Sequence, residues 1–105
     1  EWKILMEFLG GEFLAGGNLK ETSTSHWESP NKGATNESKF TALPGGSRVF
    51  TGGFDNVGHI GNWWSSNEFN ESMARYWYLT AKYPKFEESG FGKNWAFSVR
   101  CIKDF

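Results

Sequence analysis

The stretch Trp95-Ala96-Phe97-Ser98-Val99-Arg100-Cys101-Ile102 shows the clearest two-residue alternation in the chain. Trp95, Phe97, Val99 and Cys101 share one face if this segment is extended, which is typical of a half-buried strand. Ala74–Thr80 alternates with the same period. We therefore expect two strands in the C-terminal third of the chain.

A shorter strand is expected at Asn62–Ser66, where Trp63 and Trp64 must point to opposite faces. One of these indoles then belongs to the core. The linker 81–94 contains Pro84 and Gly90-Phe91-Gly92, so it can reverse the chain between the two longer strands. These features predict a small antiparallel sheet.

The N-terminus has the pattern of an amphipathic helix. Trp2, Leu5, Met6 and Leu9 recur at helical spacing, and Ile4 with Phe8 is expected to widen the apolar stripe. Gly10-Gly11 follows, and glycine commonly ends a helix. The helix resembles an element cut from a longer protein, since nothing in the sequence caps its start.

The region from Gly16 to Gly53 is rich in turn formers and predicts a long structured loop. The turn-forming groups are Gly16-Gly17-Asn18, Ser29-Pro30-Asn31, Pro44-Gly45-Gly46 and Gly52-Gly53. The expected fold class is α+β, with one N-terminal helix, the loop region and the C-terminal sheet.

The composition excludes several classes of protein. The chain has 105 residues, 11 basic and 12 acidic, for a net charge of -1, which argues against a nucleic-acid surface. Its apolar runs are too short for a membrane helix, so we expect no direct membrane insertion. The 10 Phe, 6 Trp and 3 Tyr outnumber Leu, Ile and Val together, and such aromatics serve equally as core or as contact surface.

Catalytic and cofactor signatures are missing from the sequence. Gly90-Phe91-Gly92 starts a dinucleotide pattern that Trp95 breaks, and no phosphate-binding loop is present. One Cys and the distant His26 and His59 make a metal site a poor interpretation. We expect no catalytic residues, no metal and no cofactor.

Recognisable motifs extend over nearly the whole chain in a fixed order. They are Glu1-Trp2 through Leu9-Gly10-Gly11, Ala15-Gly16-Gly17-Asn18-Leu19-Lys20-Glu21-Thr22, His26-Trp27, Ser29-Pro30-Asn31, Gly33-Ala34-Thr35-Asn36-Glu37-Ser38, Phe40-Thr41-Ala42-Leu43-Pro44-Gly45-Gly46, Arg48, Gly61, Trp63-Trp64-Ser65-Ser66, Glu68 and Phe97-Ser98-Val99-Arg100-Cys101. Together they resemble the Fibrobacter succinogenes major paralogous domain of bacterial surface and secreted proteins.

The resemblance implies a C-type-lectin-like fold and a location outside the cell or on its surface, in the Bacteroidetes–Fibrobacteres group. It also implies that residues 1–105 form a single domain, the C-terminal portion of such a domain, because family members continue upstream. The calcium motifs of C-type lectins have no match in Glu28-Ser29-Pro30-Asn31 or Asn62-Trp63-Trp64, so calcium-dependent sugar binding is not expected.

The leading hypothesis is a non-enzymatic, extracellular binding module for a glycan or another protein. The expected ligand-binding residues, on the long loop and the adjacent sheet edge, are His26, Trp27, Asn31, Asn67, Glu68 and Arg75. For Trp27 the alternative is a core side chain that anchors the loop. Other hypotheses are a structural spacer, which predicts that nearly all aromatics are buried, and an enzyme related to formylglycine-generating enzymes, which needs a reactive cysteine.

Cys101 is the single cysteine of the chain. Its alternation with Phe97 and Val99 predicts a buried thiol that packs on the N-terminal helix and is unpaired within this chain. The resemblance implies a disulfide partner upstream of Glu1. Without that segment, self-association through the N-terminal edge is a further expectation.

Overall fold

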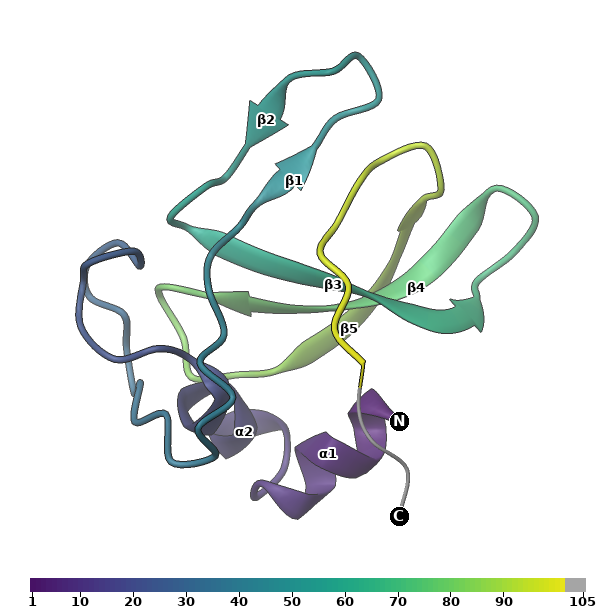
Figure 1. Ribbon diagram of the computed structural model, residues 1–105. Helices are drawn as coiled ribbons and strands as arrows, with labels where there is room; N and C mark the ends of the chain where they lie inside the picture. The colour runs from purple at the N-terminus through teal and green to yellow at the C-terminus, as the bar shows by residue number, and fades with distance from the viewer. Residues whose placement is uncertain (102–105) are drawn as a thin grey trace.

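The computed structural model describes residues 1–101 and shows a small α+β molecule (Figure 1). Its elements, in chain order, are α1 (Trp2–Phe8), α2 (Glu12–Leu19), β1 (Ser47–Arg48), β2 (Phe54–Asp55), β3 (Ile60–Glu68), β4 (Met73–Thr80) and β5 (Glu87–Gly92). β1 and β2 form one antiparallel sheet, and β3, β4 and β5 form the other. The α+β prediction is confirmed.

The predicted N-terminal helix is α1, and Gly10 and Gly11 end it with φ angles of 104° and 93°. Trp2 is buried, and Leu5, Met6 and Leu9 pack against the core. The expectation that Ile4 and Phe8 widen the buried stripe is wrong, because their side chains are 71% and 84% exposed. They lie on the side of α1 away from the sheet.

A second helix replaces the predicted turn at Gly16-Gly17-Asn18. Gly16 and Gly17 are buried where α2 approaches other backbone closely. A Cβ at Gly16 would lie 2.4 Å from the carbonyl oxygens of Pro84 and Lys85, and one at Gly17 would lie 2.2 Å from that of Gly33. The glycines therefore serve close packing of a helix rather than a turn.

The central sheet has the order β3-β4-β5, with β4 in the middle. The strands expected at Asn62–Ser66 and Ala74–Thr80 are confirmed as parts of β3 and β4. The prediction that 81–94 is a linker is wrong for its second half, since β5 pairs antiparallel with β4 from Tyr78↔Glu87 to Met73↔Gly92.

The strand expected at Trp95–Cys101 is not formed; Ile102 lies outside the described residues. The segment makes single bridges, Ala96 to Arg48 and Ser98 to Trp63. Phe97 instead covers the outer face of the sheet, with its ring centroid 4.3 Å from Trp64 and 4.9 Å from Tyr76. The aromatic contacts hold this segment (yellow in Figure 1) across the sheet without a ladder.

Cys101 is free and exposed, so the prediction of a buried thiol is wrong. The alternation that suggested burial has no meaning in a segment without strand pairing. Its expected neighbourhood is correct in one respect, since Cys101 and Trp2 line the same shallow cavity of about 300 Å³, together with Trp64 and Val99.

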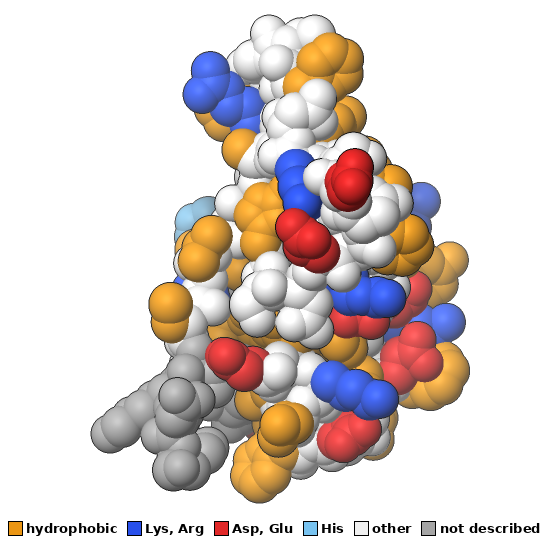
Figure 2. Space-filling view, turned by 90° about the vertical axis from the view of Figure 1, so that its right-hand side faces the viewer, with side chains coloured by type: hydrophobic (Ala, Val, Ile, Leu, Met, Phe, Trp, Pro, Cys, Tyr) orange, Lys and Arg blue, Asp and Glu red, His pale blue; other side chains and the backbone are white. Residues whose placement is uncertain are grey.

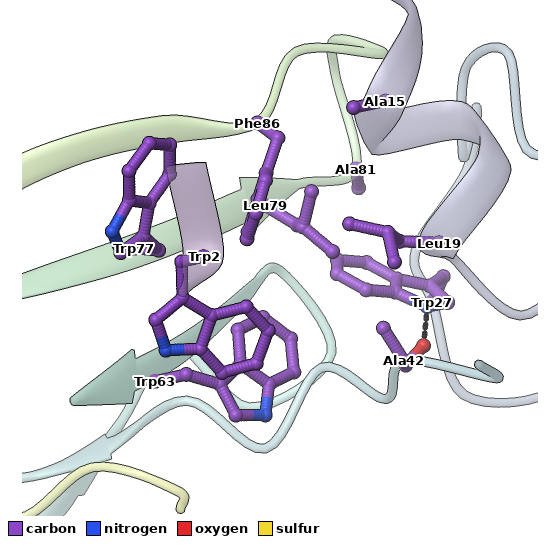
Figure 3. Close-up of a cluster of buried hydrophobic side chains, with 10 residues drawn as sticks. All are labelled: Trp2, Ala15, Leu19, Trp27, Ala42, Trp63, Trp77, Leu79, Ala81 and Phe86. Atoms are coloured by element: carbon purple, nitrogen blue, oxygen red, sulfur yellow. Dashed lines mark hydrogen bonds between the residues drawn. The ribbon is translucent and has the colours of Figure 1, made fainter. Parts of the chain in front are cut away.

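The core lies between the helices and the inner face of the sheet (Figure 3). Trp2 is at its centre, with ring centroids 6.4 Å from Trp63 and 5.7 Å from Phe86. Phe86 in turn lies 4.9 Å from Trp77. Trp63 and Trp64 do point to opposite faces, with Trp63 in this core and Trp64 against Phe97.

The long loop is confirmed for residues 20–46, which contain isolated bridges but no named helix or strand. Beyond it, the β1–β2 hairpin projects from the body of the molecule (top of Figure 1). Phe50 and Phe54 on this hairpin are 64% and 76% exposed.

Candidate functional site

The six expected binding residues fall into two groups in the structure. His26, Trp27 and Asn31 belong to the long loop, whereas Asn67, Glu68 and Arg75 lie on β3 and β4.

Trp27 is part of the core and not a stacking platform at the surface. Its side chain is 1% exposed, and Nε1 donates a hydrogen bond of 2.9 Å to the carbonyl of Ala42 (Figure 3). The alternative interpretation, that Trp27 anchors the loop, agrees with this position. Ligand contact by this ring is excluded by its burial.

Asn31 is also internal, with 6% exposure. Its Nδ2 donates to the carbonyls of Glu21 at 2.9 Å and Ser23 at 2.6 Å, which closes the turn in the loop. His26 is exposed, and its Nδ1 lies 2.8 Å from Oε2 of Glu21. Asn31 thus stabilises the loop through hydrogen bonds to its backbone, and His26 contacts Glu21 of the same segment.

Asn67 and Arg75 meet at an irregularity in the β3–β4 pairing. The register runs Trp64↔Tyr76 and then Glu68↔Ala74, so residues 65–67 stand opposite Arg75 alone. A bulge of this kind re-aims side chains at the end of a ladder. Here it brings Ser65 and Asn67 beside Arg75.

The bulge forms one wall of an open cleft of about 230 Å³. The other walls come from the start of α1, from β4 and from β5, where Glu88 is the register partner of Trp77. The residues that line the cleft are Glu1, Trp2, Lys3, Ser65, Asn67, Arg75, Trp77 and Glu88. We call this cavity the bulge cleft.

The bulge cleft is lined by two basic and two acidic side chains, and Arg75 contacts both an acidic and an aromatic neighbour. Arg75 Nη1 lies 3.6 Å from Oε1 of Glu88, and its guanidinium carbon lies 5.1 Å from the ring centroid of Phe69. Glu1 and Lys3 add one further charge of each sign. The planar guanidinium is thus fixed by an ion pair and a ring, which leaves its remaining N–H groups for a ligand.

Glu68 lies next to the cleft but faces Lys93. Nζ of Lys93 donates to Oε1 of Glu68 at 2.7 Å, and this hydrogen bond lowers the pKa of the Glu68 carboxyl below its usual value. The carboxylate is highly exposed and does not line the cleft.

The chemistry available in the cleft is hydrogen bonding by side chains. Arg75 and Lys3 donate, Glu88 accepts, and Asn67 and Ser65 do both. Among residues 1–101 no group of three or more His, Cys, Asp or Glu side chains is placed to hold a metal ion.

Sequence reasoning missed several residues of the bulge cleft. Glu88 lies in the segment 81–94, whose proline and glycines predict a linker, and the bulge that places Ser65 in the cleft leaves no mark in the hydrophobic pattern. Trp2 and Trp77 also line the cleft, but their side chains are only 6% and 5% exposed, and the apolar pattern of the sequence marks them as core residues.

The fold and the cleft define a small α+β domain with a long loop and a cleft lined mainly by polar and charged side chains. The chain belongs to a known family: the family model described as the Fibrobacter succinogenes major domain matches residues 1–103. This confirms the resemblance drawn from the motifs. No curated protein and no solved structure matches the chain significantly. Within residues 1–101, no helix is long and apolar enough to cross a membrane.

Proposed function

We propose that this domain is a non-catalytic, extracellular binding module that recognises neutral glycans in the bulge cleft. The observation that supports it is the gathering of Arg75, Glu88, Asn67 and Ser65 in one cleft, beside the largely buried indoles of Trp2 and Trp77. Sugar hydroxyl groups both donate and accept hydrogen bonds, so they match a site whose side chains offer both functions. The balanced charges favour a neutral sugar over an acidic one.

The C-type-lectin-like fold and the bacterial cell-surface location belong to the same proposal. Family membership supports both, because the motifs of this chain resemble those of surface and secreted proteins. An experimental structure superposed on C-type lectin domains tests the fold. Fractionation of the producing bacterium, with the protein in the membrane-associated or secreted fraction, tests the location.

The ligand hypothesis is tested with an array of neutral and acidic glycans. We expect binding to neutral glycans, and we expect Arg75→Ala to lower the affinity at least about tenfold, because a hydrogen bond to a charged group is lost. His26→Ala is the matched control, since this exposed side chain does not line the cleft. A blank array for the folded protein, or equal losses in both variants, contradicts the proposal.

A protein ligand is the second candidate, and a specific observation favours it. The projecting β1–β2 hairpin exposes Phe50 and Phe54, and Arg48 lies 5.7 Å from the Phe54 ring. Figure 2 shows this narrow projection at the top of the molecule, with hydrophobic side chains on it. Exposed aromatic and arginine side chains are enriched at binding hot spots. Loss of a captured protein on Phe54→Asp, with unchanged glycan binding, supports this candidate.

The spacer and enzyme hypotheses are less well supported. A spacer predicts nearly complete burial of the aromatics, whereas Phe8, Phe50 and Phe54 are each more than 60% exposed. The enzyme hypothesis needs an activated cysteine. Among the described residues, the cavity beside Cys101 has no histidine in its lining to act as a base.

A further inference from the structure

The two helices carry an exposed apolar surface that the core does not use. Ile4 and Phe8 on α1 are 71% and 84% exposed, and Phe13 and Leu14 on α2 are 63% and 64% exposed. We call these four residues the helical patch. In Figure 2, hydrophobic side chains also emerge at the lower end of the molecule, at the height of the helices in Figure 1. The two helices contact one another, and large apolar side chains exposed on neighbouring elements mark candidate interaction surfaces.

On α1 the exposed residues form two parallel stripes. Ile4 and Phe8 are four residues apart and share one stripe, and Lys3 and Glu7, also exposed, share the neighbouring one. Each charge is thus beside an apolar residue, and the two stripes run along the same side of the helix. The opposite side of α1 holds Trp2 in the core.

We propose that the helical patch is the interface of a homodimer in which the α1 helices of two copies pack antiparallel. A two-fold axis across the middle of α1 reverses the helix and keeps each stripe on its own side. Ile4 then meets Phe8 of the second copy, and Lys3 meets Glu7 of the second copy. One operation therefore pairs apolar with apolar and positive with negative, twice each.

This self-complementarity selects a second copy over a different partner. The exposed charges on α1 beside the patch are one Lys and one Glu, so neither an acidic nor a basic partner is favoured. On α2, Lys85 Nζ lies 4.9 Å from the Phe13 ring centroid, and the exposed Glu12 supplies the opposite charge. The patch is small, and interfaces at the low end of the size range are reversible.

Sedimentation equilibrium from about 1 µM to about 1 mM chain tests the proposal. We expect a monomer–dimer equilibrium, and we expect Phe8→Glu to raise the dissociation constant more than about tenfold. Phe54→Glu is the matched control, because Phe54 is a similarly exposed aromatic on the distant hairpin. All these side chains are exposed, and circular dichroism verifies that each variant is folded.

Charge exchange tests the antiparallel arrangement itself. Lys3→Glu and Glu7→Lys each place like charges opposite one another, so each weakens the dimer by about three- to tenfold. The double variant K3E/E7K restores the pairs and the wild-type dissociation constant. Sedimentation is measured without any sugar, so an effect of the Lys3 substitution on ligand binding in the bulge cleft does not alter the measured dissociation constant of the dimer. A monomer at all concentrations, a dimer sensitive to Phe54→Glu, or a double variant as weak as the singles overturns the proposal.

Discussion

Lys20 shows how a single side chain organises the long loop. It is fully buried, and Nζ donates to the carbonyls of Lys32 at 2.8 Å, Thr80 at 3.0 Å and Tyr83 at 3.2 Å. It also lies 5.5 Å from the ring centroid of Trp27. One ammonium group therefore joins the end of α2 to the loop, to the end of β4 and to the turn that follows β4.

We expect Lys20→Met to destabilise the domain by about 2–4 kcal/mol. The methionine fills much of the space, but three part-buried carbonyl groups lose the ammonium donor that they share, and a buried polar group without a partner is costly. Urea unfolding followed by tryptophan fluorescence measures the change. Lys32→Met is the control, because that side chain is exposed and its backbone carbonyl remains. Equal stability of the two variants contradicts this role of Lys20.

The pH dependence of stability gives a second test of Lys20. Burial lowers the pKa of Lys20 from 10.5 to about 8. Between these values the unfolded chain binds more protons than the folded one, so this residue makes stability rise with pH. Tyr76 and Tyr78 have raised pKa values and act in the opposite direction only near and above pH 10. The rise from pH 8 to 9.5 should therefore be smaller in Lys20→Met.

Single residues were predictable from sequence where one residue type has one common role. Trp2 was predicted on the apolar face of a helix, and one of Trp63 and Trp64 was predicted to be core; the core contains Trp2 and Trp63. Lys20 gave no sign of its position, because lysine is almost never fully buried. Trp27 and Asn31 have polar neighbours in the sequence, and their burial depends on contacts with distant residues that local pattern does not report.

At the scale of elements, α2 depends on two glycines that a helix normally disfavours. We expect Gly16→Ala to destabilise the domain by about 1–3 kcal/mol, although alanine favours the helix, because the added methyl group would meet the Pro84 and Lys85 carbonyls at 2.4 Å. Denaturant unfolding measures the difference. Gly53→Ala is the control, since its nearest neighbour is a Val49 methyl at 3.7 Å. A neutral Gly16→Ala would show that the turn after β4 can move away.

A strand could be predicted from the sequence where its side chains alternate between the core and the outer face of the sheet. β4 alternates Trp77 and Leu79 with Tyr76 and Tyr78, and its prediction was confirmed. β5 has the sequence Glu-Glu-Ser-Gly-Phe-Gly, in which apolar and polar residues do not alternate. It is an edge strand that pairs with β4, and this pairing leaves no pattern in the sequence of β5 itself. Trp95–Cys101 alternates but lies over the sheet, where aromatic stacking imposes no strand geometry.

At the scale of the whole molecule, the aromatic residues separate into a buried and an exposed population. Trp63 and Trp77 are 3% and 5% exposed in the core, whereas Phe8 and Phe54 are 84% and 76% exposed on two distant surfaces. Composition alone could not make this division for phenylalanine, which occurs in both populations: Phe86 is 1% exposed in the core, whereas Phe8 and Phe54 are at the surface. A small domain with few Leu, Ile and Val residues needs the first population for stability, which leaves the second free for contacts.

This separation predicts opposite outcomes for the same kind of substitution. Trp63→Ala should cost about 3–5 kcal/mol, because it leaves a cavity beneath Trp2 and removes the partner of Trp77 on β4. Phe54→Ala should change stability by no more than about 0.5 kcal/mol, since its ring is largely in water already. Urea unfolding of both variants makes the comparison. The total stability of a domain of this size is about 5–15 kcal/mol, so Trp63→Ala alone could remove a large part of it. A comparable loss in Phe54→Ala would mean that the hairpin packs on the body of the molecule, and its aromatics would then no longer be available to a partner.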